Sequence, residues 1–180
     1  SSFASHCLTT ERSIIKIDKE LPLELMAPLG CGIQTGAAAV FNTLKVRAGT
    51  SIAIFGAGAV GLSSLMAAKI SGCSTIIAVD MFESRLQLAK ELGATHVVNA
   101  GTGKVLEEIN TITGGGADFT VEATGIPAVM TQAIHALGFN GATALVGVAG
   151  AEAAVTFNPT LLQTKCLTIN GSIMAGANTI

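Results

Sequence analysis

Three glycines and one carboxylate form the pattern in this sequence that is richest in chemistry. Gly56, Gly58 and Gly61 directly follow the apolar segment 51–55, and Asp80 ends a β-branched run nineteen positions after Gly61. Glycine permits a tight turn and lets a backbone approach a ligand that a Cβ would block. The N–H groups and positive dipole end of the following helix would face phosphates, while Asp80 would accept hydrogen bonds from an adenosine ribose. The spacing therefore predicts a dinucleotide-binding turn.

Two other interpretations of this segment are weaker. The glycines could merely loosen a turn in a glycine-rich chain, or the uncharged stretch 50–68 could cross a membrane. A strand before the turn, a helix after it and an acid at the expected distance together favour nucleotide binding. The membrane interpretation fails because glycines occupy the first half of the stretch and the next strand follows too soon. We therefore expect no membrane span.

The residues around Asp80 indicate which dinucleotide is bound. Asp80 is followed by Met81 and Phe82, with no arginine beside it to hold a 2′-phosphate, so the sequence favours NAD over NADP. Arg85, five residues after Asp80, lies in the first turn of the next expected helix and would reach the ribose or a phosphate. Its alternative role is that of a solvated helix charge next to Glu83.

Further ligand contacts are expected where two later strands end. Thr124 and Gly125 follow the fourth expected strand, and Val146, Gly147 and Val148 end the fifth. In a doubly wound sheet, ligands bind at the carboxyl ends of the strands. We therefore expect these residues to line the adenine and nicotinamide halves of the site. The alternative is ordinary use of glycine between a strand and a loop.

The remaining acids and the histidines are weaker candidates for chemistry. Asp118 and Glu122 lie four residues apart on one expected strand and so share a face. An acid/base pair would need facing partners that the sequence does not offer, so we expect a residue that starts the strand and a hydrogen-bond acceptor that ends it. His6, His96 and His135 lie far apart, which favours surface or packing roles over metal binding.

The elements that must position these residues alternate regularly along the chain. Periodicity and breaks predict strands at 51–55, 75–79, 96–99, 118–122, 142–147 and 167–173, joined by helices at 59–71, 82–92, 103–112, 127–137 and 159–164. Strands joined by helical crossovers form a parallel sheet with helices on both faces. The expected fold class is therefore α/β, a Rossmann doubly wound sheet of six parallel strands in the order 3-2-1-4-5-6.

The first part of the chain is less regular. Residues 1–17 alternate weakly and suit two short strands that belong to another domain. Residues 18–29 contain two prolines around a short helical turn, and an alanine-rich helix is expected over residues 30–45. These segments precede the glycine-rich turn, and residues 1–17 lie before the Rossmann unit.

Composition narrows the class of protein. A chain of 180 residues with a net charge of −2 suits one α/β domain and has no basic cluster for nucleic acid. The sequence opens without an initiator methionine or a basic and apolar leader. Free thiols in a reducing cytosol fit the wide spacing of the four cysteines, so a cytoplasmic location is expected; these are Cys7, Cys31, Cys73 and Cys166.

The chain is also unusually apolar. Hydrophobic residues make up 49% and charged residues only 12%. Such a composition predicts more exposed apolar surface than a self-sufficient monomer carries, unless the domain is very well packed. Missing neighbours would explain it, and both ends are expected to have been cut from a longer chain.

Longer stretches carry a resemblance to a known family. The segments 28–36, 56–62 and 80–85 resemble the zinc-dependent medium-chain alcohol dehydrogenases, most of all the aryl- or benzyl-alcohol branch. The similarity covers essentially the whole chain, since segments 92–96, 121–125 and 169–172 also match. It implies the coenzyme domain of an enzyme that transfers hydride between an alcohol or aldehyde and NAD, with zinc polarising the alcohol oxygen.

The resemblance assigns roles residue by residue. Cys31, which spacing alone makes a buried thiol at a helix start, matches a catalytic zinc ligand, and Thr35 lies near the nicotinamide. The pyrophosphate turn matches Gly56, Gly58, Val60 and Gly61. The adenosine-ribose contacts match Asp80 and Arg85. The backbone contacts to the carboxamide match Val146, Val148 and Ile173. Cys31 alone cannot hold a catalytic zinc, which needs about three protein ligands.

The expected organisation follows from this assignment. Residues 1–29 are a remnant or linker of a catalytic domain, residues 30–173 are the NAD-binding domain, and residues 174–180 are a truncated C-terminal segment. A homodimer is expected through the last strand, which lies at a sheet edge and lacks a lysine or proline to blunt it. The alternatives are a stand-alone NAD-binding module without catalysis, or a domain of a zinc-free medium-chain reductase.

Overall fold

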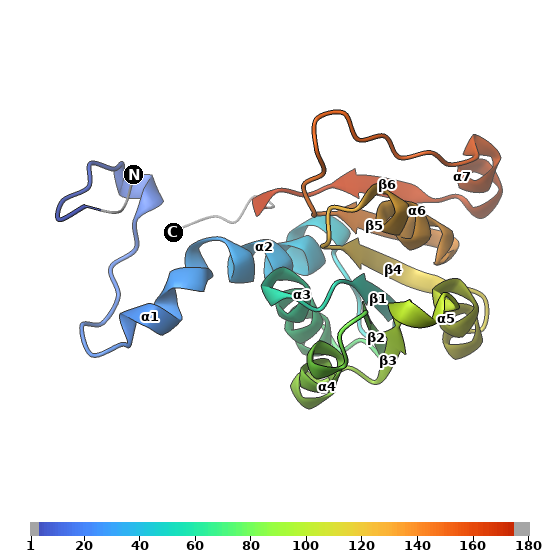
Figure 1. Cartoon of the computed structure of the whole chain (residues 1–180), viewed down its shortest axis with the longest axis horizontal. Helices are drawn as coiled ribbons and strands as arrows, with labels where there is room; N and C mark the ends of the chain where they lie inside the picture. The colour runs from blue at the N-terminus through green and yellow to red at the C-terminus, as the bar shows by residue number, and fades with distance from the viewer. Residues whose placement is uncertain (1–3, 175–180) are drawn as a thin grey trace.

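A parallel β-sheet organises the molecule (Figure 1). The computed structural model describes residues 4–174, with only the backbone for Arg12. Among these residues, six parallel strands form one sheet in the order β3-β2-β1-β4-β5-β6. The strands are β1 (Ser51–Phe55), β2 (Thr75–Asp80), β3 (His96–Asn99), β4 (Ala117–Glu122), β5 (Leu137–Leu145) and β6 (Thr168–Gly171).

Helices connect consecutive strands and cover both faces of the sheet (Figure 1). The longer ones are α2 (Gly32–Ala38), α3 (Ala59–Ile70), α4 (Glu83–Leu92), α5 (Val105–Thr113), α6 (Pro127–His135) and α7 (Pro159–Lys165). Shorter turns are α1 (Leu23–Met26), η1 (Glu11–Ser13), η2 (Ala27–Gly30) and η4 (Ala100–Thr102), and the π-helix η3 (Ala39–Leu44) continues α2. Crossovers of this kind are what parallel strands require.

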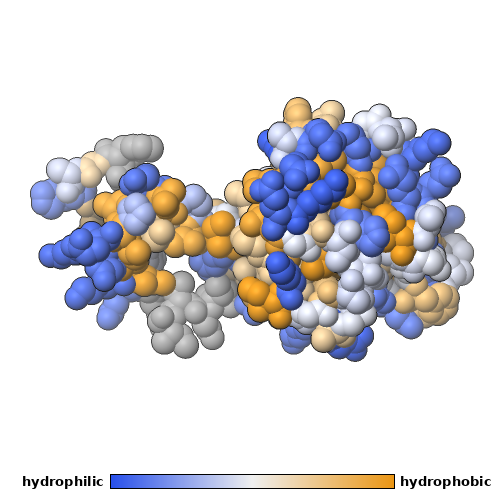
Figure 2. Space-filling view, turned by 90° about the horizontal axis from the view of Figure 1, so that it is seen from below, coloured by the Kyte–Doolittle hydropathy of each residue, from blue (hydrophilic) through white to orange (hydrophobic). Residues whose placement is uncertain are grey.

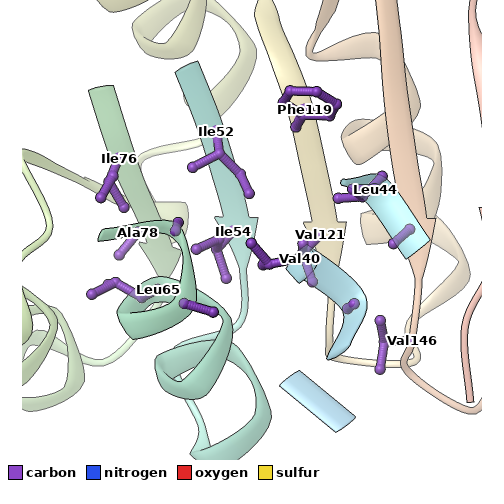
Figure 3. Packing of buried hydrophobic residues seen from close by; sticks show 14 of the residues in the cluster. Val40, Leu44, Ile52, Ile54, Leu65, Ile76, Ala78, Phe119, Val121 and Val146 are labelled. Atoms are coloured by element: carbon purple, nitrogen blue, oxygen red, sulfur yellow. The ribbon is translucent and has the colours of Figure 1, made fainter. Parts of the chain in front are cut away.

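The core has two layers because β1 is buried on both sides. Ile52 and Ile54 face α3, α4 and η3, whereas Ala53 and Phe55 face α5 and α6. In Figure 3, Val40 from η3 lies between Ile54 of β1 and Val121 of β4. A strand covered on both faces is apolar throughout instead of alternating with polar residues.

The structure confirms the predicted α/β class, the six parallel strands and their order. Two strands, β5 and β6, differ from the prediction by more than one residue. β5 begins at Leu137, because Leu137 pairs with Ala117 before the register shifts, and Asn140 takes a left-handed φ of 58° within this irregular stretch. β6 is shorter than expected, although the N–H of Ser172 still donates to the Leu145 carbonyl at 3.0 Å.

The expectation of two short strands in residues 1–17 is wrong for the residues that the structure describes. Residues 4–17 contain only the 3-10 turn η1, because no strand lies beside them to pair with their backbone groups. We call residues 4–31 the N-terminal arm; it extends away from the sheet and carries α1 (Figure 1).

The arm carries much of the apolar surface that the composition predicted. Leu8, Ile14, Ile15, Leu23 and Leu25 are all exposed. Figure 2 shows hydrophobic side chains gathered on the arm and where it meets the body.

The first helix of the body packs against α3 at a distance that excludes a side chain. A Cβ on Gly36 would collide with the Val60 carbonyl and lie 2.7 Å from the Cβ of Ser63. At the same contact, the Ser64 hydroxyl donates to the Gly36 carbonyl at 2.9 Å. α2 therefore fixes the first turns of α3, the helix that follows the glycine-rich turn.

We expect Gly36→Ala to lower the free energy of unfolding by about 1–3 kcal/mol, because the new methyl group must push α2 and α3 apart. Gly32→Ala in the same helix is the control. A Cβ there lies 3.8 Å from that of Ala59, and alanine is the better helix former, so stability should hold or rise. Urea denaturation followed by circular dichroism measures both variants. Equal midpoints would contradict the packing argument.

Candidate functional site

The glycine-rich turn joins β1 to α3 at the carboxyl edge of the sheet. Gly56 has a φ of +94°, and a Cβ there would lie 2.8 Å from the Thr124 methyl group. Gly58 is the N-cap of α3, and a Cβ there would meet nothing within 4 Å, so its surroundings are open to a ligand. A Cβ on Gly61 would collide with the Gly56 carbonyl. The turn thus places the first N–H groups of α3 at an open edge, where anions bind.

Asp80 ties this turn to the end of β2. Asp80 is only 7% exposed, and the backbone N–H of Ala57 donates to its Oδ2 at 2.7 Å. The N–H of Phe82 donates to Oδ1 at 3.0 Å, and the Arg85 guanidinium lies 3.5 Å from Oδ2. Arg85 also lies over the Phe82 ring, 4.9 Å from its centroid. Since a carboxylate offers about four acceptor positions, Asp80 can serve the turn and a ligand together.

A cavity of about 380 Å³ opens beside Asp80, which we call the first hollow. Its walls come from the glycine-rich turn, the residues after β2 and the loop after β4. Much of its wall is apolar, because Met81, Phe82 and Ile126 line it. These three residues are each more than half exposed. A mostly apolar hollow with a few converging polar groups is typical of a site for a small organic ligand.

A second hollow of about 430 Å³ lies over the ends of β5 and β6. It is lined by residues 145–148 and 171–173. The backbones of two loops meet between the hollows, because a Cβ on Gly147 would collide with the N–H of Gly125. A Cβ on Gly125 would in turn lie 2.6 Å from the Val148 carbonyl oxygen. Glycine is therefore required on both sides of this contact.

The two carboxylates of β4 have the strand-start and strand-end roles expected of them. Asp118 accepts hydrogen bonds from the N–H and hydroxyl of Ser51 at 2.8 and 2.7 Å. Glu122 is completely buried and accepts from the N–H groups of Thr124 and Gly125. Neither acid faces the other as an acid/base pair would.

The predicted site residues fall into three groups. The first hollow gathers Gly56, Gly58, Asp80, Arg85 and Thr124. The second gathers Val146, Gly147, Val148 and Ile173. Val60 and Gly61 lie in the first turn of α3 and Thr35 is buried in α2, so these three line neither hollow.

Sequence reasoning missed part of the wall of the first hollow. Ile126, Val129 and Gln132 belong to the loop after β4 and to α6, and no spacing rule marks them. Their only signal is position, since Ile126 is an apolar residue in a loop just before the helix proline Pro127.

Cys31 differs from the expectation of a buried thiol, because it is exposed at the junction of the arm with α2. Among residues 4–174, no three His, Cys, Asp or Glu side chains come together in a way that could hold a metal ion. A catalytic zinc therefore does not fit the donors that these residues supply.

Cys73 is half-buried, and burial raises the pKa of its thiol.

No helix among the described residues is long and apolar enough to cross a membrane. The fold and the two hollows define a dinucleotide-binding Rossmann domain, with its ligand edge at the carboxyl ends of the strands.

Comparison with known proteins specifies the family. A family model described as zinc-binding dehydrogenase matches residues 59–180, more than half of the chain. The chain therefore belongs to the zinc-binding dehydrogenases, as a coenzyme-binding domain of the medium-chain alcohol dehydrogenase type.

Individual relatives agree with this assignment. An alcohol dehydrogenase zinc-binding domain protein from Burkholderia ambifaria is 52% identical with a TM-score of 0.88, over 92% of this chain and 45% of that one. Benzyl alcohol dehydrogenase from Acinetobacter calcoaceticus is 48% identical with a TM-score of 0.87, over 91% and 45%. A Pseudomonas protein named as a probable alcohol dehydrogenase is 43% identical, over 96% of this chain and 56% of that protein. The chain thus spans about half the length of such relatives.

Proposed function

We propose that this chain is the NAD(H)-binding part of a zinc-dependent alcohol dehydrogenase that transfers hydride between a small alcohol or aldehyde and NAD. The observation that carries the proposal is the position of Asp80. Its carboxylate closes the glycine-rich turn, borders the first hollow and is available to ribose hydroxyls. The high identity to a benzyl alcohol dehydrogenase supports an alcohol as the substrate of the whole enzyme.

The residues present suit the two ends of a dinucleotide. The turn at Gly56 and Gly58 offers N–H groups to the pyrophosphate, and Asp80 with Arg85 holds the adenosine ribose. Phe82 and Ile126 provide apolar walls for the adenine. The second hollow would take the nicotinamide, with the backbone of Val146, Val148 and Ile173 binding its carboxamide. When bound, the nicotinamide supplies the hydride acceptor, and these residues orient it.

Asp80 also decides between NAD and NADP in this proposal. A 2′-phosphate would come close to a carboxylate that is nearly buried, and Arg85 is already engaged by that carboxylate. A zinc-binding dehydrogenase from Sinorhizobium meliloti 1021, 25% identical with a TM-score of 0.74, was solved bound to NADP, so family membership alone does not select NAD. The environment of Asp80 supports NAD for this chain.

We further propose that residues 30–173 form the coenzyme domain and that residues 1–29 are a remnant or linker of a catalytic domain. The exposed leucines and isoleucines of the arm support this division into domains. So many apolar side chains on one segment favour a surface that covers them. The zinc ligand role of Cys31 would require its partners to come from that domain. Of the proposed C-terminal segment 174–180, residues 175–180 lie outside the described residues.

Association through β6 is proposed as well. β6 forms one edge of the sheet, so one row of its N–H and C=O groups is available to another strand. Its sequence is uncharged, and a two-fold partner would extend the sheet through the edge.

We expect NAD to bind more tightly than NADP by at least about tenfold, or about 1.4 kcal/mol, because Asp80 repels the 2′-phosphate. Isothermal titration calorimetry of the chain with each dinucleotide measures both constants. Equal or tighter binding of NADP would refute the role given to Asp80.

Substitution of Asp80 should separate its two functions. Asp80→Gly removes both the charge and the acceptor of the Ala57 N–H, so NAD should bind more weakly and its advantage over NADP should shrink. Asp80→Asn is the matched control, because it keeps an acceptor oxygen and loses the charge. It should reduce the preference for NAD with less loss of affinity. If both variants keep the wild-type preference, the discrimination lies elsewhere.

Purified alone, the chain should neither oxidise benzyl alcohol with NAD nor retain stoichiometric zinc, because residues 4–174 supply no metal-binding cluster. NADH absorbance and elemental analysis test the two statements. Turnover that a chelator abolishes would show that this chain binds zinc and oxidises the alcohol by itself, contrary to the proposal.

The association proposal is tested by light scattering at tens of micromolar. We expect a dimer for the wild-type chain and a monomer for Ile169→Lys, since a charge on the edge strand discourages pairing. A monomeric wild-type chain would exclude β6 as a dimer edge.

A further inference from the structure

Glu122 is a buried acid that the proposed binding scheme does not use. It ends β4 and is completely buried. Its Oε1 accepts the Thr124 N–H at 2.7 Å, the Gly125 N–H at 3.2 Å and the Thr124 hydroxyl. Burying a carboxyl group costs free energy unless hydrogen bonds satisfy it. The three donors around Glu122 meet this need and fix the position of its side chain.

The same residue also holds the loop after β5. The backbone carbonyl of Glu122 accepts the N–H groups of Val146 and Gly147 at 2.8 and 3.0 Å. A Cβ on Gly147 would lie 2.8 Å from Oε2 of Glu122, so the backbone of this loop passes close to the carboxyl group with no side chain between them. The side chain of Glu122 therefore holds the loop after β4, and its backbone carbonyl holds the loop after β5.

Each of these loops borders a different hollow. Thr124 and Ile126 line the first hollow, and the Thr124 hydroxyl also accepts the Ile126 N–H at 3.1 Å. Gly147 and Val148 line the second. Glu122 lies where the two sets of contacts meet.

We propose that Glu122 is a positioning residue that locks the loop after β4 to the loop after β5 and so couples the two halves of the dinucleotide cleft. The inference rests on the proposed function, in which the first hollow holds the adenosine end of NAD and the second holds the nicotinamide end. A ligand group that orders the first loop then orders the second through the Glu122 carboxyl group. This is a coupling between two parts of one site, carried by the hydrogen bonds of the loop after β4 to the carboxyl group and by the close packing of Gly147 against that group.

A carboxylate suits this position because both of its oxygens accept: Oε1 takes the three bonds above, and Oε2 also accepts the Gly125 N–H at 3.3 Å. Two N–H groups and a hydroxyl converge on it, and an ionised carboxylate is a pure acceptor. Glutamine keeps one acceptor oxygen but turns an NH₂ group toward the Gly125 N–H or the Gly147 backbone. Methionine fills a similar volume and leaves all three donors without an acceptor.

The test combines two variants with a matched control. Glu122→Gln and Glu122→Met change the proposed lock, and Asp118→Asn changes the other acid of β4, which bonds Ser51 away from both hollows. Dissociation constants for AMP and for NAD are measured by calorimetry, at a temperature where circular dichroism shows each variant folded. The amide resonances of Gly147 and Val148 are followed by NMR while AMP, which occupies only the adenosine end, is added.

In the wild-type chain, AMP should shift the amides of Gly147 and Val148. Glu122→Gln should reduce this shift and weaken NAD by about threefold, and Glu122→Met should abolish the shift and weaken NAD by at least about tenfold. Asp118→Asn should leave both readouts within about twofold of wild type. Loss of stability alone would lower the melting temperature without changing the affinity of the folded protein.

Two results would overturn the inference. One is an unchanged NAD affinity in Glu122→Gln, the variant expected to fold even if Glu122→Met does not. The other is an AMP-induced shift of Gly147 that persists at full size in Glu122→Gln, because coupling would then run through the direct Gly125–Val148 contact. Failure of the wild-type chain to bind AMP or NAD would instead refute the proposed function.

Discussion

The close approach of backbones at the carboxyl edge of the sheet is the constraint on which the site depends. Parallel strands deliver their loops to one edge, and here the loops after β1, β4 and β5 touch through Gly56, Gly125 and Gly147. A Cβ at any of the three would meet another loop at less than 3.0 Å. The hollows on either side exist because the loops between them occupy so little space, and a larger residue would move the walls of both.

Such tight loops bury backbone N–H groups that water cannot reach. Two acidic side chains act as the acceptors for these groups. Asp80 accepts from the glycine-rich turn, and Glu122 accepts from the loop after β4. An unsatisfied buried N–H costs about 1–3 kcal/mol, so these acids stabilise the loops before any ligand arrives. Asp80 has a cation beside it in Arg85, whereas hydrogen bonds from backbone and hydroxyl groups surround Glu122. The polar part of the cleft is therefore preorganised.

The fold was predictable because its signals are local. Apolar runs such as Ile52–Phe55, with glycine and an acid at fixed distances, define strand, turn and helix within thirty residues. The strand order then follows from the arrangement typical of doubly wound dinucleotide-binding sheets. The arm was mispredicted because weak alternation specifies a strand only where a partner strand exists. The lining of the first hollow by α6 depends on how a helix packs across the sheet, which no spacing encodes. Strand-end position indicated Glu122 as an acceptor, but its contact with Gly147 arises only when β4 and β5 pair.

The exposed arm has a consequence for how the stability of this domain is measured. Burying one leucine or isoleucine contributes about 1.5–3 kcal/mol, so covering Leu8, Ile14, Ile15, Leu23 and Leu25 would contribute roughly 10 kcal/mol, comparable to the whole stability of an ordinary domain. Any surface that covers the arm in the folded state is linked to folding by mass action. The unfolding midpoint of the body would then depend on the concentration of that surface, and the heat capacity change of unfolding would grow with the apolar area it hides.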